Sequence, residues 1–160
     1  MATTIRVVLL FLAQALMASA ASATCWQSGV GAQAVFRHPS VAEEYQQAQF
    51  VVVARAAHER NIFSEADPDD YDWTVYDVEV LQTYKGHPPH IIHLSSENSS
   101  ARFPLDTGKT YLLFITRMPM EEHEGDEILP ADFVDNCGNS DVMQAAGETL
   151  KAVSQLSAGR

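Results

Sequence analysis

Hydrophobic and polar residues alternate over short distances along most of the chain, and polar turns separate the apolar runs. The run 50–57, FVVVARAA, is rich in β-branched residues and predicts a mostly buried strand. Apolar and acidic residues alternate between Tyr76 and Val80, which is typical of a strand with one buried face. Pro130 limits the last of the expected strands to an edge or a bend. The five expected strands cover residues 50–57, 73–84, 90–94, 110–117 and 128–134.

Two other segments have the residue spacing of helices. Ser40 precedes the run 41–48, VAEEYQQA, and together with Glu43 it forms the sequence of a capping box. Near the C-terminus, apolar residues recur at intervals of four or three, as on one face of an amphipathic helix. They are Val142, Ala146, Leu150, Val153 and Leu156. Asn139 or Ser140 is expected to cap this C-terminal helix, and Gly147 to weaken its interior.

The order of these elements predicts the fold class. Strands do not alternate with helices, which disfavours a parallel sheet built from βαβ units. Short strands with one helix before and one after them fit an all-β fold with peripheral helices. A small closed or partly closed β-barrel of the OB type is such a fold. No internal repeat or low-complexity linker divides the chain, so residues 24–160 are expected to form a single domain.

The N-terminus has the sequence features of a secretory signal peptide. Arg6 supplies the positive charge, Val7 to Met17 form a short apolar run, and small residues follow up to Ala23. We expect cleavage after Ala23, so that residues 1–23 are removed and the protein is secreted or periplasmic. The apolar run is shorter than the roughly 20 residues that a membrane-spanning helix needs, so no membrane insertion of the mature form is expected.

Acidic residues outnumber basic ones in this chain. It has 10 Lys and Arg against 21 Asp and Glu, a formal net charge of −11. Removal of Arg6 with the signal peptide makes the mature charge −12. This charge argues against nucleic acid or an anionic membrane as a partner, and it is compatible with a basic partner or with divalent cations.

Cys25 and Cys137 are the two cysteines of the chain. In an exported protein, two cysteines most simply form one disulfide. Ser22 and Thr24 are poor matches to the aliphatic and small residues that precede a lipid-modified cysteine, so a lipid anchor at Cys25 is disfavoured.

Several quoted segments together resemble a known family. They are AQFVVVARA (48–56), YDVEVLQTYKG (76–86), HIIHL (90–94), FPLDTGKTYLLF (103–114) and VDNCGNSD (134–141). The chain is similar to the netrin-like, or NTR, superfamily, which includes the tissue inhibitors of metalloproteinases, and more closely to small exported bacterial proteins of that fold. The resemblance implies a five-stranded OB-like closed barrel with a C-terminal helix packed on it. It also implies that Cys25 pairs with Cys137 and ties the N-terminal segment to the body.

The chain departs from the inhibitor branch of that superfamily at its mature start. In that branch the first residue is a disulfide-bonded cysteine, whose amino group and carbonyl oxygen bind the zinc of the target enzyme. Here Thr24 precedes Cys25, and Trp26 and Gln27 stand where that branch has a C-x-C sequence. Metalloprotease inhibition through the N-terminal segment therefore stays an alternative and is not our main expectation.

Other candidate sites have simpler interpretations. His87, His90 and His93 are three residues apart, but on a strand the last two point to opposite faces, so a shared metal is not expected. The two acidic runs, 65–72 and 121–127, are expected to be solvated loops, because the first lacks the Gly and Glu that a calcium-binding EF-hand loop needs. We predict no metal and no cofactor.

The sequence contains no G-x-S-x-G, H-E-x-x-H or P-loop motif. We therefore expect no enzyme, and instead a non-catalytic binding module that recognises a protein partner. Its candidate contact residues are Thr24, Cys25, Trp26 and Trp73. A metal-binding protein or an enzyme of another type is the remaining alternative.

Overall fold

The computed structural model describes residues 26–28, 34–36, 38–63, 69–99, 102–117 and 129–159. The predicted signal peptide, 1–23, and two of the predicted contact residues, Thr24 and Cys25, lie outside this part of the chain. No helix in the described part is long and apolar enough to span a bilayer.

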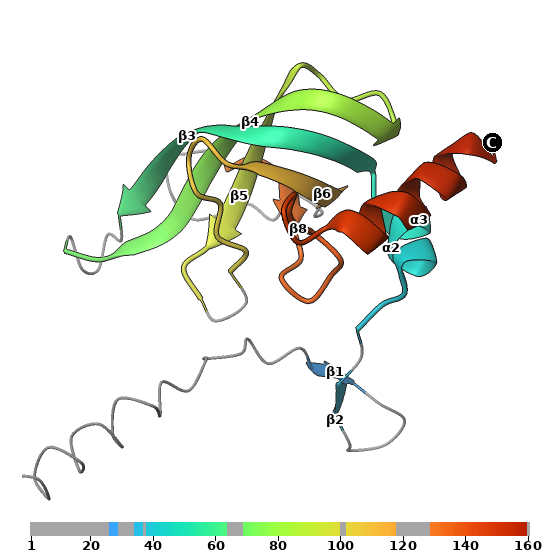
Figure 1. Cartoon of the computed structure of the whole chain (residues 1–160). Coiled ribbons are helices and arrows are strands. Elements are labelled where there is room, and N and C mark those ends of the chain that lie inside the picture. Colours follow the sequence, from blue (N-terminus) through green and yellow to red (C-terminus); the bar gives the residue numbers. More distant parts are fainter. Residues whose placement is uncertain are drawn as a thin grey trace, which may run out of the picture.

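Five strands close into a barrel (Figure 1). Their hydrogen-bonded order is β3-β4-β5-β7-β6, and β6 pairs with β3 to complete the ring. The contact between β5 and β7 is parallel and the other pairings of the ring are antiparallel, so the barrel is mixed. This confirms the predicted all-β class and the OB-like closed barrel. The strands are β3 (Phe50–Phe63), β4 (Tyr71–Lys85), β5 (Ile91–Glu97), β6 (Thr110–Arg117) and β7 (Asp132–Val134).

Two hydrophobic cores explain the continuous apolar run of β3. Val52 and Ala54 belong to the core inside the barrel, together with Tyr76 of β4. Val51 and Val53 point the other way and join a second core that includes residues of both described helices. Because successive side chains of a strand point to opposite faces, a strand buried on both sides needs apolar residues at every position.

The two helices of the described residues are α2 (Val41–Gln47) and α3 (Gly147–Ala158), which lie together on one side of the barrel (Figure 1). The capping box of α2 is confirmed. The Ser40 hydroxyl accepts a hydrogen bond from the Glu43 backbone N–H at 3.2 Å, and the Glu43 carboxylate accepts one from the Ser40 N–H at 3.0 Å. These reciprocal bonds satisfy donors that a helix start otherwise leaves unpaired.

The predicted start of the C-terminal helix is wrong. Asp141 and Val142 instead form the short strand β8 (Asp141–Val142), which pairs with β6. The backbone of β8 is hydrogen-bonded to β6 in an extended conformation, so these residues cannot form the first turn of a helix. Helix α3 therefore begins only at Gly147, after Ala146. Gly147 is therefore the first helical residue and not an interior one. The predicted apolar face is otherwise present, since Val153 is buried in the second core and Leu150 and Leu156 pack against it.

Strands β3, β4 and β5 are longer than the sequence pattern indicated, and β3 and β5 extend furthest beyond it. Strand β3 continues from His58 to Phe63 as mostly exposed residues, because its backbone pairs with β4 there. Strand β5 continues from Ser95 to Glu97, beyond the expected strand 90–94. Cross-strand hydrogen bonding holds these residues in the sheet, so apolar alternation does not reveal them.

A further antiparallel pair of strands precedes the barrel in the chain. It consists of β1 (Trp26–Ser28) and β2 (Ala34–Phe36), and Trp26 pairs with Phe36 in the backbone register.

Candidate functional site

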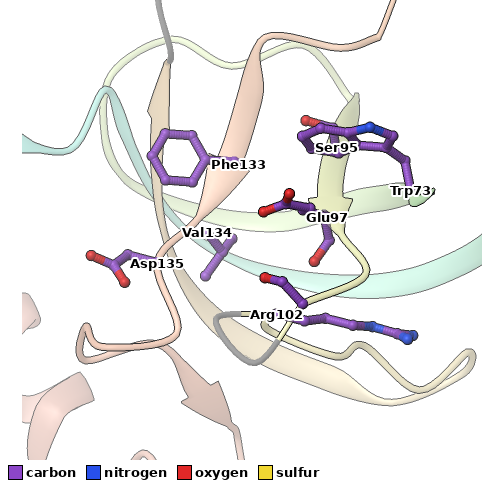
Figure 2. A pocket seen from close by; sticks show the side chains of 9 residues that line it. Trp73, Ser95, Glu97, Arg102, Phe133, Val134 and Asp135 are labelled. Atoms are coloured by element: carbon purple, nitrogen blue, oxygen red, sulfur yellow. The ribbon is translucent and has the colours of Figure 1, made fainter. Parts of the chain in front are cut away.

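A pocket lies where β4, β5 and β7 meet, next to the segment that follows β5 (Figure 2). Its volume is about 290 Å³. Aromatic, acidic, hydroxyl and basic side chains all contribute to its wall. The lining residues are Trp73, Ser95, Ser96, Glu97, Ser99, Arg102, Phe133, Val134 and Asp135.

The register of the barrel places Trp73 beside Glu97. Trp73 of β4 is the direct antiparallel partner of Glu97 of β5. Residues directly opposite each other on antiparallel strands project from the same face, with Cβ atoms about 5 Å apart. Trp73 is half-buried and Glu97 is exposed, so an indole ring and an accessible carboxylate share one wall of the pocket.

Arg102 forms part of the floor. One of its terminal nitrogens donates to the Tyr71 hydroxyl, and the other donates to the Tyr76 hydroxyl at 2.9 Å. The guanidinium carbon also lies 5.6 Å from the centre of the Tyr71 ring, within the range of a cation–π contact. Burial alone would lower the pKa of Arg102, but the hydrogen bonds and charge interactions with Tyr76 and Tyr71 raise it overall, so the guanidinium stays charged.

The guanidinium of Arg102 is turned away from the wall of the pocket that Phe133, Val134 and Asp135 form. Figure 2 shows the side chain extending away from Phe133, Val134 and Asp135. Its Nε is buried and has no hydrogen-bond partner among the described residues. Arg102 therefore contributes mainly its aliphatic part to the pocket lining, while its charged end interacts with Tyr71 and Tyr76.

The opposite wall comes from β7 and the residue after it. Phe133 and Val134 supply apolar surface, and Asp135 follows the end of the strand. Asp135 Oδ1 accepts a hydrogen bond from the Cys137 N–H at 2.8 Å, so one of its oxygens holds the next turn of the chain. The Ser95 hydroxyl donates to the Pro130 carbonyl at 2.8 Å and connects β5 to the segment that leads into β7.

The side chains that line the pocket suit the recognition of another molecule. An aromatic ring, a neighbouring carboxylate and apolar side chains offer stacking, ionic and hydrophobic contacts to an entering group. The pocket lining contains no histidine or cysteine among its described members. In the described part of the chain, no group of three or more His, Cys, Asp or Glu side chains is placed to hold a metal ion.

Of the four predicted contact residues, one lies at this pocket. Trp73 is in the wall, whereas Trp26 is described only as a backbone position in β1, and Thr24 and Cys25 lie outside the described residues. Sequence reasoning missed the remaining lining residues. Glu97 lies outside the five strands that the sequence predicts, and only the extension of β5 opposite β4 brings it to Trp73.

Cys137 lies in the turn after β7 and is not a free thiol. Its predicted partner, Cys25, is outside the described residues, so the pairing stays a prediction.

The histidines of the 87–93 segment interact with acidic residues of β4. His93 Nδ1 lies 2.6 Å from Asp77 Oδ1, and His90 Nε2 lies 3.6 Å from Glu79 Oε1. His87 lies in the exposed turn between β4 and β5. Asp69, Asp70 and Asp72 are exposed, while the other acidic residues of the two predicted loops lie outside the described part of the chain.

Compared with known proteins, the chain matches no protein-family model and no curated protein. The netrin-like resemblance of its sequence therefore remains a proposal.

Proposed function

We propose that this protein is an exported, non-catalytic binding module that recognises a protein partner through the pocket at Trp73. The observation that carries the proposal is the position of Trp73, which is half-buried in the wall of a pocket and directly opposite the exposed Glu97. Tryptophan is enriched among the residues that dominate binding energy at protein interfaces, where it occupies the centre of a contact.

The size of the pocket favours a side chain of a protein partner over a small-molecule ligand or a cofactor. Pockets for drug-sized ligands have volumes of roughly 300 to 1,000 Å³. The volume here, about 290 Å³, is at the lower end of that range, so the pocket is small for such a ligand. One inserted side chain, with neighbouring contacts on the surface around it, fits this volume.

The proposal includes export and an N-terminal tether. A disulfide between Cys25 and Cys137 would close a loop of about 110 residues and stabilise the fold by roughly 4 to 5 kcal/mol in the chain-entropy model. Two contacts support the tether. Asn139, two residues after Cys137, donates through Nδ2 to the Pro39 carbonyl at 3.0 Å. Trp26, the residue after Cys25, pairs with Phe36, three residues before Pro39.

Membership of the netrin-like superfamily is part of the same proposal. The closed five-stranded barrel with the C-terminal helix packed against it supports this membership, because it is the fold that the resemblance implies. Non-reducing and reducing mass spectrometry of the exported protein tests the tether and the mature start together. A start at Thr24 and a reduction-dependent mass gain of about 2 Da are expected, whereas a start at Cys25 would favour the metalloprotease-inhibitor alternative.

Site-specific photo-cross-linking tests the binding function. A photoreactive amino acid replaces the exposed Ser99 at the pocket, and in a matched control it replaces the exposed Gln155 on α3. After exposure to the native exported fraction, a discrete protein adduct is expected with the Ser99 variant and not with the Gln155 variant. Adducts that are absent, or equal at both positions, would contradict recognition at this pocket.

A further inference from the structure

We infer that the pocket accepts a basic side chain, lysine or arginine, from the partner. This inference rests on the proposed function and names the chemistry of the group that enters. It depends on the charge state of the pocket wall, on the aromatic ring beside it, and on the orientation of Arg102.

Glu97 differs from neighbouring carboxylates on the barrel surface. Asp77 pairs with His93, and Glu79 pairs with Arg55. No hydrogen bond or ion pair with another described residue engages the Glu97 carboxylate, and its side chain is exposed. Figure 2 shows this carboxylate among the pocket side chains, on the side facing Phe133 and Val134. It is therefore available to an incoming donor.

Trp73 adds a second contact for a cation. A lysine ammonium or arginine guanidinium near the face of an indole ring is attracted to the electron-rich face of the ring, and more strongly where water is excluded. Since Trp73 and Glu97 project from the same face, one cation can contact the ring and the carboxylate together. Phe133 and Val134 offer apolar surface to the methylene groups of the same side chain.

The arrangement of Arg102 disfavours the opposite choice, an anionic ligand. Its terminal nitrogens donate to Tyr71 and Tyr76, its Nε is buried, and its charged end is turned from the Phe133 wall. Glu97 and Asp135 are exposed at the same pocket. The net charge of the chain, −11, also attracts basic partners over longer distances.

A titration followed by NMR tests the inference on the whole mature protein. The probes are Nα-acetyl-lysine amide and Nα-acetyl-arginine amide, with the norleucine amide as the neutral analogue and the glutamate amide as the anionic one. Shifts of the Trp73 indole N–H and of the backbone amides of 95–99 and 133–135 report binding at the pocket. The two variants are Glu97→Gln and, as a matched control, Glu148→Gln on the exposed start of α3.

One or both basic probes should bind at the pocket more tightly than the neutral probe, by about threefold or more. Added salt should reduce this ratio of affinities. Glu97→Gln should weaken this preference and Glu148→Gln should leave it unchanged. Equal binding of the neutral probe, preference for the anionic probe, or no shift at the pocket would each overturn the inference. A cross-linked partner whose binding is unaffected by Glu97→Gln would also overturn it, while the proposed function would stand. Basic probes that bind without any protein adduct at Ser99 would contradict the proposed function alone.

Discussion

Asn139 donates two hydrogen bonds to a single oxygen of Glu44. Its backbone N–H and its side-chain Nδ2 both lie 2.6 Å from Glu44 Oε2. Glu44 belongs to α2 and is 8% exposed, whereas Asn139 lies in the loop between β7 and β8. The loop is also close to the helix at Gly138, where an added Cβ would lie 2.1 Å from Glu44 Oε1. This contact fixes the loop that carries Cys137 against the first helix.

Removal of the Asn139 side chain should destabilise the fold. Asn139→Ala loses the bond to Glu44 and the bond to the Pro39 carbonyl, and it leaves a buried carboxylate with one donor fewer. The expected loss is about 1 to 3 kcal/mol in the free energy of unfolding. Urea denaturation measures it, with Asn136→Ala in the same loop as a control. Equal stability of the two variants would show that the Glu44 contact contributes little.

Glu44 should make stability depend on pH. Burial and the nearby charge of Asp135 raise the pKa of Glu44 above its ordinary value of 4.5, although the Asn139 hydrogen bonds and His38 partly offset this. Between 4.5 and the raised pKa, the folded protein holds a proton that the unfolded chain has released, so stability falls as pH rises through this window. Glu44→Gln, which carries no charge, should lose that fall. Unfolding free energies measured from pH 4 to 7 test this, and parallel curves for the two proteins would contradict it.

Lys85 should contribute strongly to the end of α2. Its Nζ donates to three backbone carbonyls, those of Tyr45, Gln46 and Ala48, at 2.6 to 2.7 Å. A cation at a helix C-terminus satisfies carbonyls that lack intrahelical partners. Lys85→Met should therefore cost about 1 to 3 kcal/mol. Thermal denaturation compares this variant with Lys151→Met on the exposed surface of α3, and an equal loss in both would contradict the assignment.

Two glycines with positive φ should differ in their tolerance of alanine. At Gly108, with φ of 89°, an added Cβ meets nothing within 4 Å, so only backbone strain of about 1 to 2 kcal/mol is expected. At Gly86, with φ of 80°, it would lie 2.6 Å from both the Gln49 carbonyl oxygen and the Phe50 ring. Gly86→Ala should therefore lower stability by at least about 1 kcal/mol more than Gly108→Ala. Equal denaturation midpoints would mean that the turn at Gly86 relaxes readily.

The sequence predicted the barrel well because its strands are buried in regular patterns. The β-branched run of β3 and the alternation in β4 follow directly from which faces are covered. The segments that resemble the netrin-like family contain residues with identifiable structural contacts. Lys85 ends β4, Gly86 begins the turn after it, and Asn139 fixes the loop after β7. These residues are therefore informative about the fold without indicating a binding site.

The candidate site was harder to predict because it depends on register and on the loop after β5. Trp73 was a candidate from its residue type alone. The polar run that begins at Ser95 contains no apolar alternation, so nothing local indicated that Glu97 would pair with Trp73. Arg102 and Phe133 are distant from each other in sequence, and only closure of the barrel brings them to one pocket. The start of α3 was misplaced for a similar reason, since pairing with β6 is a long-range interaction.

The most direct test of partner recognition at the pocket is the affinity of the cross-linked partner for two aromatic variants. Trp73→Ala removes the ring from the pocket wall, and Phe63→Ala removes a ring that is 60% exposed and does not line the pocket. Both purified variants are compared with the unmodified protein by calorimetry, after thermal denaturation has shown that each is folded. We expect Trp73→Ala to raise the dissociation constant at least about tenfold, as loss of a dominant interface residue does, and Phe63→Ala to leave it unchanged. An unchanged dissociation constant for folded Trp73→Ala would contradict recognition at this pocket.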